Sequence, residues 1–196
     1  MKLYYSPGAC SLSPHIVLRE AGLKFEPVLA STKTHKLQDG TDYYTINPKG
    51  YVPLLELDNG ERLSEGPAIV QYIADQAPDK KLAPANGTFA RARLQEWLNF
   101  TTSEIHKTYS PLFNAAVPEE YKTMAKAKLQ DRYRWVDSQL EGKSYLLGDA
   151  FSVADAKIAH GGGKPVLEIG VKAVLRLTRL QIEKAEDKRA GEAEQR

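Results

Sequence analysis

The first residue in this sequence with obvious chemistry is Cys10, the one cysteine among 196 residues. It follows a short β-prone run, 2–5, and comes just ahead of an expected helix. Free backbone N–H groups and the macrodipole at a helix start favour an anion and can lower the pKa of a thiol. Cys10 is therefore a candidate for facing a bound thiolate. The alternative is a small buried residue in a tight loop.

A second candidate is the Val52-Pro53 dipeptide, which precedes an expected strand at 54–57. A cis bond before Pro53 would turn the chain and leave the N–H and C=O groups of Val52 facing outward. Those groups could then pair with the backbone of a peptide. The alternative is an ordinary trans proline that begins a strand.

A third candidate is the segment Ser64-Glu65-Gly66-Pro67, which stands at the start of a later helix. The free amides there could hold a carboxylate, while Glu65 accepts a hydrogen bond from an ammonium group. Together these groups suit the head group of an amino acid. The alternative is that Glu65 only complements the helix dipole.

A polar stripe on one helix is the last candidate. Asn99, Ser103 and His106 are spaced by four and three residues, which places them on one helix face, where they can line a cleft. The alternative is a solvated face with one satisfied histidine. The four histidines of the chain are scattered and predict no metal site.

These candidates need a scaffold, and the element pattern of the first half predicts one. A strand at 2–5, a helix that begins at Ser13-Pro14 and a strand at 25–29 form a β-α-β unit with parallel strands. Asn59-Gly60 between two short strands is a strong hairpin signal, and a further helix opens at Gly66. This order is the thioredoxin-like arrangement.

The second half of the chain is predicted to be helical. The stretch 78–84 has two prolines and several charges and reads as a linker. Apolar residues then recur at helical spacing over 89–114 and 118–140. We therefore predict an α/β domain at 1–80 and an all-α domain at 87–196.

Composition excludes several classes of protein. Hydrophobic residues at 42% and charged residues at 27% indicate a folded chain, and a net charge of +2 is too weak to suggest nucleic acid as the partner. The N-terminus lacks the apolar run of a signal peptide, and no stretch of about 18 apolar residues could span a membrane. The expected location is the cytoplasm.

At this point the sequence resembles a known family, the beta-class bacterial glutathione transferases, from Met1 to about Ala156. Four segments in the family's order carry the resemblance: Tyr5-Ser6-Pro7-Gly8-Ala9-Cys10-Ser11-Leu12, Asn47-Pro48-Lys49-Gly50-Tyr51-Val52-Pro53, Trp97-Leu98-Asn99 through Glu104-Ile105-His106-Lys107, and Phe151-Ser152-Val153-Ala154-Asp155. The last of these resembles the family's N-capping box and hydrophobic staple for a buried helix.

The resemblance implies a homodimer that binds glutathione and a hydrophobic electrophile, without a metal. Cys10 would lie near the glutathione sulfur, Val52 would pair with its cysteinyl backbone beside a cis Pro53, and Glu65 with Gly66 would hold its γ-glutamyl end. Asn99, Ser103 and His106 would complete the site, with His106 and Cys10 as the catalytic pair. The family often uses a lysine for the glycyl carboxylate, and the matching position here is His35, flanked by Lys33 and Lys36.

The activity implied is conjugation of the glutathione thiolate to hydrophobic electrophiles, as in detoxification. One alternative is glutathione-dependent thiol exchange or reductive dehalogenation through a mixed disulfide on Cys10. Another is a non-catalytic protein that binds glutathione or another ligand without turnover.

The sequence departs from the family after Ala156. Lys157-Ile158-Ala159-His160-Gly161-Gly162-Gly163-Lys164-Pro165 stands where the family would carry a long apolar helix, and three glycines and a proline would break one. We hypothesise a reading-frame change or an unusual terminus, which the nucleotide sequence can test.

Overall fold

The computed structural model describes residues 1–159, so most of the atypical C-terminus, including a charge-rich stretch at 183–196, lies outside the described residues. The first half contains a four-stranded sheet in the order β2-β1-β3-β4. Its elements are β1 (Lys2–Tyr5), α1 (Leu12–Glu20), β2 (Glu26–Leu29), β3 (Leu54–Glu56), β4 (Arg62–Ser64) and α2 (Gly66–Asp75). β1 pairs with β2 in parallel and with β3 antiparallel, and β3 and β4 form the antiparallel hairpin.

Side chains of β1 alternate between the two faces of the sheet, and each face packs against a buried cluster. Leu3 belongs to the large core cluster with α1 and α2, to which Val17 and Ile69 contribute. Tyr4 points to the other face and packs with Tyr43 in a smaller cluster under the segment that joins β2 to β3. This period of two is what strand geometry requires of a sheet that is covered on both sides.

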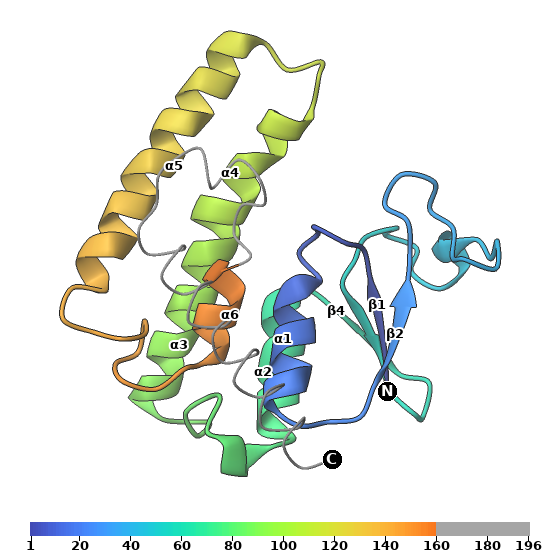
Figure 1. The fold of residues 1–196 in the computed structure, drawn as a ribbon, viewed down its shortest axis with the longest axis horizontal. Coiled ribbons are helices and arrows are strands. Elements are labelled where there is room, and N and C mark those ends of the chain that lie inside the picture. The colour runs from blue at the N-terminus through green and yellow to red at the C-terminus, as the bar shows by residue number, and fades with distance from the viewer. Residues whose placement is uncertain (160–196) are drawn as a thin grey trace, which may run out of the picture.

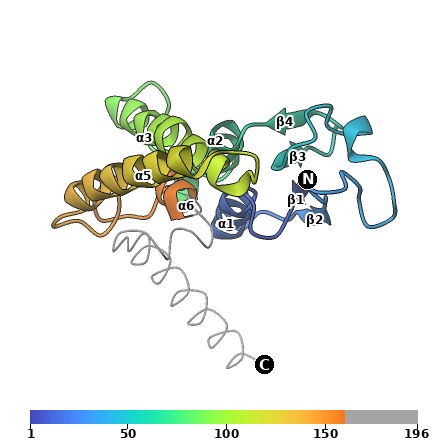
Figure 2. The same cartoon turned by 90° about the horizontal axis from the view of Figure 1, so that it is seen from above.

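The second half is helical, as predicted. It contains α3 (Phe89–Phe100), a π-helical segment (Thr101–His106), α4 (Lys107–Tyr109), a 3-10 turn (Ser110–Phe113), α5 (Glu119–Gln139) and α6 (Val153–Ala159). Figures 1 and 2 show α1 and α2 between the sheet on one side and these helices on the other. α6 contacts α1, α2 and α3, so it lies at the junction of the two halves.

A buried carboxylate anchors the start of α6. Asp155 is fully buried and accepts hydrogen bonds from the Leu146 amide at 2.8 Å, the Ser152 amide at 2.9 Å and the Ser152 hydroxyl at 2.8 Å. The amide of Val153 donates to the Leu82 carbonyl at 2.9 Å. The expected capping box is therefore present, and it ties α6 to the two loops beside it.

A second polar contact joins α2 to α3. The guanidinium of the buried Arg91 donates to both carboxylate oxygens of Asp75, at 2.8 and 2.7 Å, and to the Pro84 carbonyl at 3.0 Å. A bidentate pair of this kind fixes both distance and orientation. It holds the end of α2 against the first turn of α3.

The predicted fold class, a thioredoxin-like α/β domain followed by a helical region, is confirmed. The boundary near residue 80 stays a prediction. The predicted start of the first helix is wrong: α1 begins at Leu12, so Ser13 and Pro14 lie inside it. The residue before α1, Ser11, makes no side-chain cap but bonds both backbone groups of Ser6, because the tight loop from β1 brings them within 3.1 and 3.2 Å.

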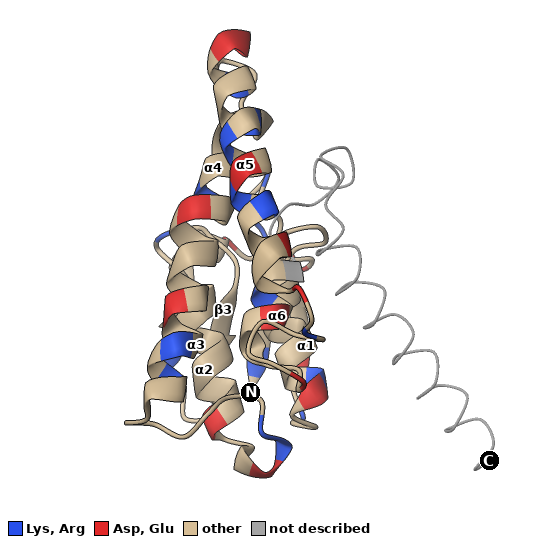
Figure 3. Cartoon of the chain, turned by 90° about the vertical axis from the view of Figure 1, so that its left-hand side faces the viewer, with Lys and Arg blue, Asp and Glu red and all other residues tan. Residues whose placement is uncertain are grey.

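Figure 3 shows charged residues of both signs along α3 and α5. Within residues 1–159, no helix combines the length and the apolar character that crossing a bilayer requires. The same residues contain no cluster of three metal-ligating side chains.

Candidate functional site

The thiol of Cys10 lies against the segment before β3. Its Sγ donates to the carbonyl of Val52 at 3.0 Å, and the Val52–Pro53 peptide bond is cis, as predicted. The turn ahead of this bond is fixed by two donors to the Tyr51 carbonyl, the hydroxyl of Tyr43 at 3.0 Å and the amide of Asn47 at 2.7 Å. The loop after β1 and the loop before β3 therefore meet at one sulfur atom.

Two expectations for this pair need correction. Burial raises the pKa of the Cys10 thiol above its ordinary value, whereas the helix start alone had predicted a lowered one. Desolvation of the thiolate outweighs the opposing effect of the nearby Lys157. The Val52 carbonyl is also not free, because it accepts the hydrogen bond of the thiol in this structure.

Glu65 occupies the position before α2 in a strained conformation. Its φ is +70°, a region that non-glycine residues rarely adopt and that is often found at binding sites. Its side chain is 68% exposed, and one carboxylate oxygen accepts a hydrogen bond from Lys49 Nζ at 3.1 Å. The carboxylate is thus open to an ammonium group next to the backbone amide of Gly66 at the start of α2.

Lys49 is a contributor to this corner that the sequence did not assign. Its Nζ also bonds the hydroxyl of Ser64 at 3.2 Å, so it links the turn before β3 to the start of α2. The motif Asn47-Pro48-Lys49 carried no signal for this contact, because its partners lie 15 and 16 residues away along the chain.

His35 lies in the loop between β2 and β3 with a φ of +52°. Its Nδ1 is 3.2 Å from the carbonyl oxygen of Gly50, and its ring packs on Tyr44 with centroids 4.6 Å apart. These contacts place His35 beside the turn that leads to Val52. Lys33 and Lys36, its predicted neighbours, are exposed.

The polar stripe lies across the junction of α3 and the π-helical segment. Ser103 Oγ donates to the carbonyl of Asn99 at 3.0 Å, and both residues are exposed. His106 is partly buried at the end of the segment, and burial lowers its pKa, with smaller contributions from Lys157 and Lys107. The imidazole is therefore neutral at neutral pH and can donate one hydrogen bond.

If His106 donates to glutathione, as the family resemblance implies, His106→Ala should weaken glutathione binding by about 1 kcal/mol, roughly fivefold, because a neutral donor is lost. It should also reduce the loss of stability in acid. The folded pKa of His106 lies below the unfolded value, so the unfolded state binds more protons as the pH falls through about 6.5, and stability falls with it. Calorimetric titration and urea unfolding at several pH values measure both effects. Unchanged affinity and an unchanged acid response would remove His106 from the site.

Lys157 lies close enough to interact electrostatically with three of the predicted site residues, Cys10, Glu65 and His106. Within the described residues, Asn99 and Ser103 bond to each other and not to this group. Nothing in the sequence alone placed Lys157 in the site, because it is simply the first residue after the family resemblance ends at Ala156.

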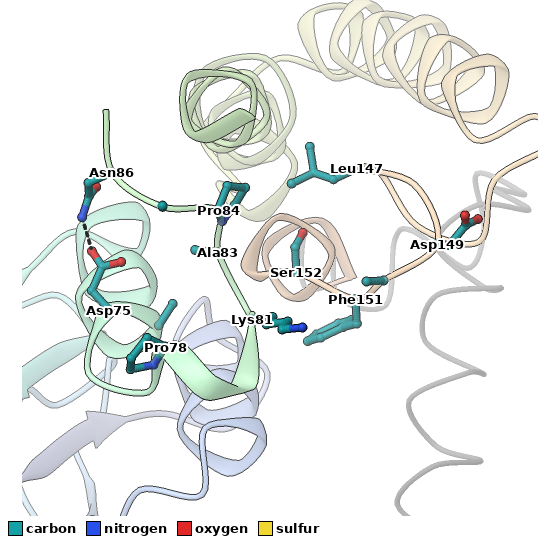
Figure 4. A pocket seen from close by; sticks show the side chains of 13 residues that line it. Asp75, Pro78, Lys81, Ala83, Pro84, Asn86, Leu147, Asp149, Phe151 and Ser152 are labelled. Carbon is teal, nitrogen blue, oxygen red and sulfur yellow. Dashed lines mark hydrogen bonds between the residues drawn. The ribbon is translucent and has the colours of Figure 1, made fainter. Parts of the chain in front are cut away.

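Two cavities lie away from these residues. One of about 740 Å³ lies between the end of α2, the 78–86 linker and the 147–152 loop (Figure 4). Another of about 420 Å³ lies beside the aromatic cluster of Trp97, Phe100 and Trp135. Neither includes Cys10, Glu65 or His106.

The strand order β2-β1-β3-β4 defines a thioredoxin-like domain. Its thiol bonds to the carbonyl of the residue before a cis-proline, so the domain has a thiol site. Comparison with known proteins makes the class specific. Residues 1–75 match the family model "Glutathione S-transferase, N-terminal domain".

The chain is 44% identical to glutathione S-transferase GstA of Escherichia coli O157:H7 over 156 residues, which are 80% of this chain and 78% of that protein. Two solved structures agree. A sphingomonad glutathione S-transferase complexed with glutathione is 44% identical, with a TM-score of 0.84 over 94% of this chain and 92% of that one. A beta-class glutathione S-transferase of Sphingomonas chungbukensis is 42% identical, with a TM-score of 0.85 over 98% and 96%. The chain belongs to the glutathione S-transferase family and to its bacterial beta class.

Proposed function

We propose that the chain catalyses attack of the glutathione thiolate on a hydrophobic electrophile. The sulfur forms the new bond to carbon, and the leaving group departs with its electron pair. The observation that carries the proposal is the arrangement of Cys10, Val52 and Glu65 around the cis-proline turn. Family membership supports it, since the sphingomonad relative is solved with glutathione bound.

Each part of glutathione has a matching group in this proposal. The exposed carboxylate of Glu65 accepts a hydrogen bond from the γ-glutamyl ammonium, and the amide of Gly66 donates to the γ-glutamyl carboxylate. The backbone of Val52 pairs with the cysteinyl residue, which brings its sulfur beside Cys10. His35 reaches the glycyl carboxylate, while Asn99, Ser103 and His106 lie on the helical side of the ligand.

The experiment that tests this function is a conjugation assay of the full chain against a panel of electrophiles, such as activated halonitrobenzenes, epoxides and enones. We expect glutathione-dependent product with at least one class, above the rate without protein. Glutathione binding without product from any class would favour the non-catalytic alternative.

We also propose that the chain acts as a homodimer, that it works in the cytoplasm and that its role is detoxification. Support comes from the relatives, which are bacterial glutathione S-transferases. Light scattering of the purified chain tests the dimer, for which a single species of twice the chain mass is expected.

Cys10→Ala separates conjugation from covalent chemistry at the cysteine. We expect the variant to form no glutathione mixed disulfide, because it lacks the chain's one thiol. Conjugation should fall only in part, about two- to fivefold, because the remaining donors still favour the glutathione thiolate. Intact-mass spectrometry and the conjugation rate measure the two effects. Complete loss of conjugation with intact binding would instead indicate a mechanism through Cys10.

A further inference from the structure

Lys157 is a buried lysine of α6, the helix at the junction of the two halves. The residue is 4% exposed, and its Nζ lies 3.1 Å from the position that a Cβ on Gly66 would occupy. The missing side chain of Gly66 thus makes room for the ammonium group at the first residue of α2. α6 also contacts α1, the helix that follows Cys10.

This placement is costly for a lysine without an anion. Desolvation disfavours the charged amine, and the start of α2 has the positive end of the helix dipole. Among residues 1–159, no side chain or carbonyl hydrogen-bonds to Nζ, and no carboxylate lies within 4.0 Å of it. An anion next to Nζ would compensate both costs.

The groups that face Lys157 identify which anion this can be. From the loop after β1 the titratable neighbour is Cys10, from the start of α2 it is Glu65, and from the π-helical segment it is His106. Glu65 is already paired with Lys49, and His106 has no negative charge. The remaining acidic group is the thiol.

We propose that Lys157 is the cationic group of the thiol site, whose ammonium stabilises the thiolate of Cys10 and, on the function proposed above, the sulfur of a glutathione bound beside it. The thiol proton passes to solvent water, and the electron pair that stays on sulfur is held next to the Lys157 charge. Desolvation is the larger effect at both groups, so the pKa of Cys10 is raised and that of Lys157 is lowered; against it, Lys157 lowers the pKa of Cys10 and Cys10 raises that of Lys157.

Alkylation of Cys10 by iodoacetamide tests this without glutathione, because the thiolate is the reacting form and the chain has one cysteine. We expect Lys157→Met to slow alkylation near neutral pH about tenfold and to move the midpoint of the pH profile upward. Lys157→Arg should restore much of the rate by keeping the charge. The plateau rate at high pH, where every thiol is ionised, reports any change in access to the sulfur.

Lys24→Met removes the same charge from an exposed residue after α1 and should leave the profile unchanged. Coincident profiles for Lys157→Met and the parent, with intact circular dichroism, would overturn the proposal. If Lys157→Met does not fold, titration of carbon-13-methylated lysines in the parent and in Cys10→Ala decides: the Lys157 midpoint should fall without the thiol, and equal midpoints would overturn it. A chain that passes these tests but forms no conjugate would refute the proposed function alone.

Discussion

Asp155→Ala should destabilise the folded chain by about 3–5 kcal/mol, because it removes one acceptor and leaves three buried donors without a partner. Those donors are the amides of Leu146 and Ser152 and the Ser152 hydroxyl. Since α6 contacts α1, α2 and α3, its loosening should weaken the junction of both halves. Urea unfolding followed by circular dichroism measures the effect as a lower midpoint.

Asp149→Ala is the matched control, since Asp149 lies in the same loop region and is exposed. Its substitution should change the free energy of unfolding by less than about 0.5 kcal/mol. Equal midpoints for the two variants would show that the Asp155 network does not hold α6.

Glu65→Ala should have the second large effect, a loss of affinity for glutathione. A charged hydrogen bond to the γ-glutamyl ammonium contributes about 2–3 kcal/mol, so glutathione affinity should fall roughly 30- to 150-fold. The fold should tolerate the change, because the carboxylate is 68% exposed and alanine meets the same backbone strain at φ +70° as glutamate. Calorimetric titration with glutathione measures the loss.

Glu61→Ala removes the same charge from an exposed residue of the β3–β4 hairpin. Glutathione affinity should then match that of the parent within about twofold. An equal loss in both variants would mean that general electrostatics, and no specific contact at Glu65, controls binding.

Most of the fold could be predicted because its signals are local. The β-prone residues at 2–5 predicted the first strand, Asn59-Gly60 predicted the hairpin turn, and Gly66-Pro67 predicted the start of α2. The long helix predicted over 118–140 matches α5 at Glu119–Gln139. Each of these depends on residues that are close together in the chain.

The features that the sequence did not predict depend on contacts between residues far apart in the chain. The start of α1 shifted to Leu12 because Ser11 binds Ser6, and the 89–114 helix includes a π-helical segment at Thr101–His106 that no periodicity indicated. The pKa of Cys10 has the opposite direction from the helix-start argument, because burial by the rest of the fold decides it.

The site was predicted as a set of separate motifs, and the structure adds the residues between them. Cys10 and Val52 are 42 positions apart and yet share a hydrogen bond that neither the spacing nor the family resemblance indicated. The resemblance implied only that both residues face the cysteinyl part of glutathione. Lys49 and Lys157 had no local pattern that distinguishes them from surface lysines. Only the packing of α6 against α1 and α2 gives Lys157 its place.

Glutathione binding tests the central claim most directly when it is compared with cysteinylglycine, the same molecule without its γ-glutamyl residue. In calorimetric titrations of the full chain, we predict saturable binding of glutathione and binding of cysteinylglycine at least about 30-fold weaker, because we propose that Glu65 and Gly66 recognise the missing residue. No binding of glutathione, or equal binding of the two peptides, would contradict this account of the site.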